Sequence, residues 1–107
     1  MTDSIWHEVA PVAAVTEGCP FKALVSGVEL GLYKIDGELF AIDDICTHAH
    51  ALLTEGYLDG YIIECPLHGG CFDVRNGRGQ GLPITADVRS YPVKIEGDAI
   101  YVAIDRS

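Results

Sequence analysis

Apolar and polar residues alternate along several short stretches of this chain, and glycine, proline or aspartate commonly separates one stretch from the next. Alternation with a period of two is typical of strands that bury one face. No long stretch repeats its apolar residues with a helical period, so we expect no major helix and only a helical turn at 11–15, with Pro11 at its start. The strands that the pattern predicts are 5–9, 21–25, 28–35, 38–42, 61–64, 72–74, 91–95 and 99–104.

Two of the expected turns have the residue types of tight hairpins. Asp36-Gly37 separates the stretches 28–35 and 38–42, and Asp-Gly tolerates the positive φ angles that a two-residue hairpin requires. Glu96-Gly97-Asp98 separates the last two expected strands. Several strands at short spacing predict an all-β fold, a small antiparallel sandwich or barrel.

Residues 43–84 depart from this pattern, and we expect them to form a loop-rich subdomain inserted in the sheet framework. They contain seven of the twelve glycines: Gly56, Gly60, Gly69, Gly70, Gly77, Gly79 and Gly81. At 107 residues, the whole chain 1–107 is expected to be a single domain with one modest core.

The composition excludes several classes of partner. Apolar runs are only a few residues long, far below the roughly 20 that cross a bilayer, and the first residues lack the basic and apolar parts of a secretory signal. We therefore expect a cytoplasmic protein with no membrane partner, and we also expect a monomer. The formal net charge of −9 argues against nucleic acid.

The negative charge is uneven along the chain. Residues 1–70 hold eleven acidic and two basic side chains, whereas residues 71–107 hold five of each. Such an acidic portion either steers a basic docking surface on a partner protein or forms solubilising loops. The sequence favours neither interpretation over the other.

Two half-motifs carry the candidate chemistry. Cys46-Thr47-His48 and Cys65-Pro66-Leu67-His68 are separated by 16 residues and supply two thiolates and two imidazoles. This ligand set suits zinc, or an iron–sulfur cluster in which cysteines bind one iron and histidines the other. Zinc would make the protein a structural module, whereas the cluster would make it an electron carrier.

Histidine ligands would have a definite electrostatic effect on such a cluster. Two ferric ions, two sulfides and two thiolates sum to zero charge, which neutral imidazoles leave unchanged, whereas four cysteines would give a dianion. Adding an electron to a neutral centre costs less. The reduction potential is therefore higher, roughly −150 to +300 mV against about −400 mV for plant-type clusters.

These half-motifs and their surroundings resemble the Rieske [2Fe–2S] ferredoxins of bacterial aromatic-ring-hydroxylating dioxygenases. The resemblance extends through Arg75-Asn76-Gly77, Gly81-Leu82-Pro83 and 91–95, almost the whole chain. It implies that Cys46 and Cys65 bind the inner iron, that His48 and His68 bind the outer iron, and that a loop around Pro83 covers the cluster. It also implies a one-electron carrier, itself not an enzyme, between an NAD(P)H-dependent flavin reductase and a terminal Rieske non-haem iron oxygenase.

The chain departs from respiratory Rieske proteins at four positions. Their disulfide cysteines correspond to Ala51 and Leu67 here, and their Ser and Tyr hydroxyls near the cluster sulfurs correspond to Gly70 and Phe72. Each missing hydroxyl removes a hydrogen bond that would stabilise the reduced state. We therefore expect a potential at the low end of the Rieske range.

Several other residues have simpler interpretations than metal binding. His50 is expected at the surface or behind the ligands, Cys71 is expected to be a small buried residue, and Cys19 lies in a turn-like tetrapeptide. Asp43-Asp44 is expected to shape the turn before Cys46. The main rival function is the small Rieske-like subunit of an assimilatory nitrite reductase, which is favoured where the ligands are absent; a zinc-stabilised binding module is a further alternative.

Overall fold

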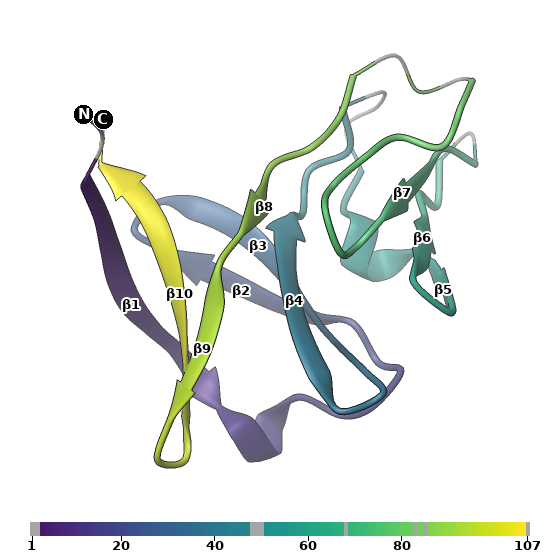
Figure 1. Ribbon diagram of the computed structural model, residues 1–107. Coiled ribbons are helices and arrows are strands. Elements are labelled where there is room, and N and C mark those ends of the chain that lie inside the picture. The colour runs from purple at the N-terminus through teal and green to yellow at the C-terminus, as the bar shows by residue number, and fades with distance from the viewer. Residues whose placement is uncertain (1–2, 48–50, 68, 83, 85, 107) are drawn as a thin grey trace.

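The computed structural model describes residues 3–47, 51–67, 69–82, 84 and 86–106 (Figure 1). Strands dominate this part of the chain, and its helices are two short 3-10 turns, η1 (Val12–Ala14) and η2 (Leu53–Glu55). Within it, no helix is long and apolar enough to cross a membrane. The strands are β1 (Asp3–Pro11), β2 (Phe21–Val25), β3 (Val28–Ile35), β4 (Glu38–Asp43), β5 (Tyr57–Asp59), β6 (Ile62–Glu64), β7 (Cys71–Asp73), β8 (Ser90–Tyr91), β9 (Val93–Glu96) and β10 (Ala99–Arg106).

The strands form three sheets, and all of their pairings are antiparallel. We call the sheets β1-β10-β9 and β2-β3-β4-β8 the framework; β8 leads into β9 and connects them (Figure 1). The third sheet, β5-β6-β7, comes from the chain between β4 and β8 and lies to one side of the framework (Figure 1). The prediction of an all-β antiparallel fold is confirmed.

Strand β3 is buried on both of its faces and separates two apolar cores. Successive strand residues point to opposite faces, so Leu32 packs in one core and Tyr33 in the other. The first core lies within the framework and contains Val15, Val25, Leu30, Leu32, Ala41, Ile100, Val102 and Ile104. The second joins the framework to the third sheet and contains Tyr33, Ile35, Ile42, Cys46, Leu53, Ile63, Cys65, Phe72, Val74, Ile84 and Val88.

The hairpin turns in the framework have the geometry expected of their residues. Asp36 and Gly37 have φ angles of 53° and 79°, and Ser26 and Gly27 between β2 and β3 have 50° and 81°. Two successive positive φ angles match the twist of the flanking strands. The carboxylate of Glu17 also accepts hydrogen bonds from the N–H groups of Asp36 (2.7 Å) and Gly37 (3.2 Å).

Some element boundaries differ from the expectation. The predicted strand 91–95 is divided at Pro92, because proline has no N–H to donate to a ladder, and β8 ends before it. The Pro92 carbonyl still accepts a hydrogen bond from the Ala103 N–H at 3.0 Å. The sequence pattern does not predict β5 or η2, since three residues are too few to show a period.

Candidate functional site

The two cysteines of the half-motifs lie at corresponding places in two loops. Cys46 follows β4 and Cys65 follows β6, and their residue exposures are only 4% and 1%. Both side chains belong to the core that joins the framework to the third sheet. The other two predicted ligands, His48 and His68, lie outside the described residues, as do His50 and Pro83.

Each cysteine stands at the base of a loop that is closed in the same way. The Cys46 N–H donates to the Ala51 carbonyl at 3.0 Å, and the Cys65 N–H donates to the Gly70 carbonyl at 2.6 Å. Each bond thus closes the loop onto the residue five positions later. We call these loops 46–51 and 65–70. In the sequence, each of them contains one of the predicted histidine ligands, and both have the same closing hydrogen bond.

The two thiols are neighbours and are not joined in a disulfide. Burial, and then the adjacent Cys46 side chain, raise the pKa of the Cys65 thiol above its ordinary value, while the Leu67 N–H acts in the opposite direction. A metal that binds here must therefore displace a proton from the buried thiol. Two adjacent buried sulfur ligands suit zinc or one iron of a cluster, so the donor set fits the expected group.

A buried carboxylate anchors loop 46–51 on its framework side. Asp44 is fully buried, and it accepts hydrogen bonds from the Thr54 N–H (2.7 Å) and hydroxyl (2.9 Å). Its carbonyl accepts a further bond from the Leu53 N–H at 2.7 Å. Burial raises the pKa of the Asp44 carboxyl, and the bonds from Thr54 oppose that shift.

Asp43 ties the same end of β4 to the strand that returns from the site. Its carboxylate accepts hydrogen bonds from the Arg89 N–H at 3.0 Å and from the Tyr91 hydroxyl. Burial and this carboxylate raise the pKa of Tyr91 to about 12. The carboxylates of Asp43 and Asp44, expected to shape the turn before Cys46, instead bond to residues far along the chain, at positions 54, 89 and 91.

A third stretch of chain, segment 81–88, completes the surroundings of the two loops. The Thr47 hydroxyl donates to the Ala86 carbonyl at 2.8 Å across 39 residues of sequence. The Asp87 carboxylate accepts a bond from the Gly79 N–H at 2.9 Å. The structure therefore brings Ala86 against Thr47, a contact for which the sequence gives no local signal.

Large apolar side chains are exposed near the loops. Leu67 within the second half-motif is 47% exposed, and Leu82 in segment 81–88 is 88% exposed. Cys71, expected to be buried, is half-buried, with its sulfur 3.5 Å from the Gly69 carbonyl oxygen.

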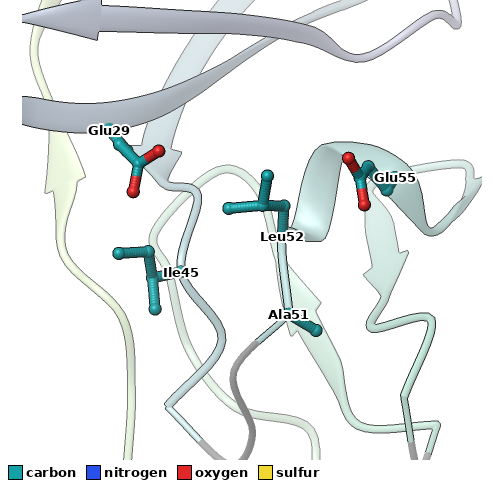
Figure 2. Close-up of a pocket in the computed structure, with 5 residues that line it drawn as sticks. All are labelled: Glu29, Ile45, Ala51, Leu52 and Glu55. Atoms are coloured by element: carbon teal, nitrogen blue, oxygen red, sulfur yellow. The ribbon is translucent and has the colours of Figure 1, made fainter.

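An open hollow of about 250 Å³ lies beside the base of loop 46–51 (Figure 2). Ile45 and Leu52 line it from the two arms of the loop, which are bridged there, together with Ala51. Glu29 and Glu55 stand along its upper side in Figure 2. Neither of the described predicted ligands, Cys46 and Cys65, lines it.

Within the described part of the chain, no group of three potential metal ligands lies together. The cysteine pair is thus half of the predicted set. Sequence reasoning missed the bonds from Thr54 to Asp44 and from Thr47 to Ala86, and the packing of Ile84 on Gly70. A threonine within a half-motif is the only local signal among them.

Comparison with known proteins agrees with this geometry. Residues 5–92 match the model of the Rieske [2Fe-2S] domain. The chain is 44% identical over 102 residues to the ferredoxin component of the naphthalene 1,2-dioxygenase system of Pseudomonas putida, covering 95% of this chain and 96% of that protein.

Solved structures give the same result. The Sphingomonas yanoikuyae B1 ferredoxin has a TM-score of 0.85 and 40% identity, covering 96% of this chain and 100% of that one. A ferredoxin-like match in a complex of reduced oxygenase and oxidized ferredoxin of carbazole 1,9a-dioxygenase has a TM-score of 0.86 and 34% identity, covering 94% of each chain. The NADH-dependent nitrite reductase small subunit of Mycobacterium tuberculosis has a TM-score of 0.83 but 18% identity, which shows a shared fold alone.

The family match extends over most of the chain, and it includes both loops and the buried thiol pair at their bases. The chain therefore belongs to the Rieske [2Fe–2S] domain family, and its cofactor is one [2Fe–2S] cluster.

Proposed function

We propose that this chain is the ferredoxin component of an aromatic-ring-hydroxylating dioxygenase system. It accepts single electrons from an NAD(P)H-dependent flavin reductase and passes them to a terminal Rieske non-haem iron oxygenase. It works as a soluble cytoplasmic monomer. It is an electron-transfer component and not a catalytic subunit, like the relatives named as ferredoxin components.

The observation that carries this proposal is the buried pair of thiols, each at the base of a loop with the same closure. Cys46 and Cys65 hold one iron, while His48 and His68 hold the other. When bound, the cluster supplies one-electron chemistry at a higher potential than an all-cysteine cluster. The apolar core around the two cysteines excludes water from the sulfur side of the site.

The surface of the protein also suits transient association. Leu67 directly precedes the proposed ligand His68 and is half exposed, so it offers an apolar contact beside the electron exit. The net charge of −9 favours partners with a basic docking surface. A low-affinity, salt-sensitive encounter is what repeated one-electron delivery requires.

Two measurements test the proposal. Purified protein is examined for iron, acid-labile sulfide and zinc, and by absorption and EPR spectroscopy after reduction with dithionite. It is then added to a ring-hydroxylating oxygenase of the naphthalene class with its reductase, and product formation is followed. We expect two irons and two sulfides per chain, as a [2Fe–2S] cluster contains, and ferredoxin-dependent turnover.

The alternatives give different results. A colourless protein that contains zinc would support the structural module. A coloured protein that supports no ring hydroxylase but completes a nitrite reductase would support the rival subunit. Cys19→Ser is the matched control, because Cys19 is exposed and lies outside the two half-motifs.

A further inference from the structure

Ile84 of segment 81–88 rests on two glycines beside the site. It is 6% exposed and belongs to the same core as Cys46 and Cys65. A Cβ atom added to Gly70 would lie 2.4 Å from Ile84 Cδ1 and 2.9 Å from Cγ1. A Cβ added to Gly79 would lie 2.4 Å from Ile84 Cγ2. Carbon atoms in contact need about 3.5–4 Å, so neither position has room for a Cβ atom unless Ile84 shifts.

The backbone itself does not demand glycine at these two positions. Gly69 and Gly77 have φ angles of 70° and 79°, in the left-handed region that favours glycine. Gly70 and Gly79 are not among the residues with positive φ. The position of the Ile84 side chain is therefore what leaves no room for a larger residue at 70 or 79.

Gly70 belongs to the Cys65 loop, and Gly79 lies beside β7, the strand that follows this loop. The Gly70 carbonyl accepts the hydrogen bond from the Cys65 N–H that closes loop 65–70. Gly79 forms a bridge with Phe72 of β7, and its N–H is bonded to Asp87. The Ile84 side chain thus packs against Gly70 at the base of the Cys65 loop.

We propose that Ile84 is a positioning residue that holds the reduction potential of this protein low. Its side chain fills the room over Gly70, and so keeps both a side-chain hydroxyl and water away from the base of loop 65–70. Hydrogen-bond donors near the sulfurs stabilise the more negative reduced state and raise the potential. The proposal rests on the proposed cluster ligation by Cys46 and Cys65.

The first test is a graded truncation of Ile84. Ile84→Val removes Cδ1, the atom nearest the added Cβ of Gly70, and Ile84→Ala also removes both γ carbons. We expect the midpoint potential to rise from wild type to Val to Ala as water gains access. For Ile84→Ala the reduction equilibrium should shift about tenfold, which is about 59 mV for one electron. The absorption spectrum should keep its form.

The second test uses Gly70. Gly70→Ser alone should lower the unfolding temperature because its Cβ overlaps Ile84. Gly70→Ser/Ile84→Ala should recover part of that loss and should have a higher potential than Ile84→Ala alone. Gly70→Ala/Ile84→Ala is the matched control: it has the same Cβ without the hydroxyl, and its potential should not exceed that of Ile84→Ala.

These outcomes separate the inference from the proposed function. If wild-type protein binds no cluster, the proposed function fails. If wild type is loaded but Ile84→Val and Ile84→Ala keep its potential with intact spectra, Ile84 is merely structural. Tolerance of Gly70→Ser without any loss of unfolding temperature would also overturn the inference. Ile84→Val is the mildest change, so it keeps the test decisive if the larger truncation unfolds.

Discussion

Different interactions stabilise the framework and the cluster-binding region. We use the second name for loops 46–51 and 65–70, the β5-β6-β7 sheet and segment 81–88. The framework has long antiparallel ladders, such as the pairing of β1 with β10, over a core of aliphatic side chains. The cluster-binding region has three-residue strands, and much of its order comes from single hydrogen bonds between distant residues.

The difference shows how a small protein can bring two buried cysteines together without long strands. Ladders stabilise the framework through many equivalent bonds, so the loss of one is a small change. The cluster-binding region depends on a few specific contacts, such as Thr47 with Ala86 and Ile84 with its two glycines. Each of these contacts should therefore affect the site more than it affects the fold.

The largest effect is expected for Cys46→Ser. Serine removes one of two neighbouring buried sulfurs, so we expect complete loss of the visible spectrum and of bound iron. The framework should keep its β-type circular dichroism, since its ladders do not involve Cys46. Cys19→Ser should bind iron like wild type. A Cys46→Ser protein with a full cluster spectrum would contradict the proposed ligand set.

A core truncation in the framework should instead act on stability. Leu32 is fully buried in the framework core. Leu32→Ala should lower the free energy of unfolding by about 2–5 kcal/mol, measured with denaturant, while the folded fraction keeps the wild-type spectrum. Leu24→Ala is the control, because Leu24 is 72% exposed, and it should change stability by less than about 0.5 kcal/mol.

A smaller effect is expected at a contact that connects the two regions. The Asp73 carboxylate accepts hydrogen bonds from the Arg75 guanidinium at 2.8 and 3.0 Å, and that guanidinium lies over the Tyr61 ring. The Tyr61 hydroxyl in turn donates to Asp36 in the framework hairpin. Asp73→Asn should lower the free energy of unfolding by about 1 kcal/mol at neutral pH, a modest value because Arg75 is half exposed.

The pH dependence of this contact has a definite sign. Arg75 lowers the pKa of the Asp73 carboxyl in the folded protein. Its contribution is therefore present above the unfolded pKa of about 4, and it disappears as pH falls through the lower folded value. The stability difference between wild type and Asp73→Asn should shrink in acid. A difference that stays constant from neutral pH into acid would refute the assignment.

The smallest structural effect is expected for Leu67→Asp. Its exposed side chain adds little to stability, so unfolding should change by less than about 0.5 kcal/mol. Electron delivery to the oxygenase should nevertheless slow several-fold, because a charge replaces apolar contact beside His68. Leu24→Asp, on β2, is the surface control for stopped-flow measurements. Unaltered kinetics for Leu67→Asp would exclude this docking contact.

The sequence predicts the framework well for physical reasons. Strand β3 is apolar on both faces, and Asp36-Gly37 can adopt the φ angles of a tight turn, so both signals are local. The division of the predicted strand 91–95 at Pro92 could also have been predicted, since proline cannot donate a hydrogen bond to a ladder. The short elements β5 and η2 could not be predicted, because their conformation depends on neighbouring parts of the fold more than on their own residues.

The same distinction applies to the site. The ligand types and their spacing are local, and they predict a site for zinc or for an iron–sulfur cluster. The resemblance of the surrounding residues to Rieske ferredoxins is what favours the cluster. Only the tertiary structure decided that the two cysteine loops close alike, that Thr47 reaches Ala86, and that Ile84 packs against glycines at positions 70 and 79. These contacts join residues far apart in the chain, and their atoms meet only when the cores pack.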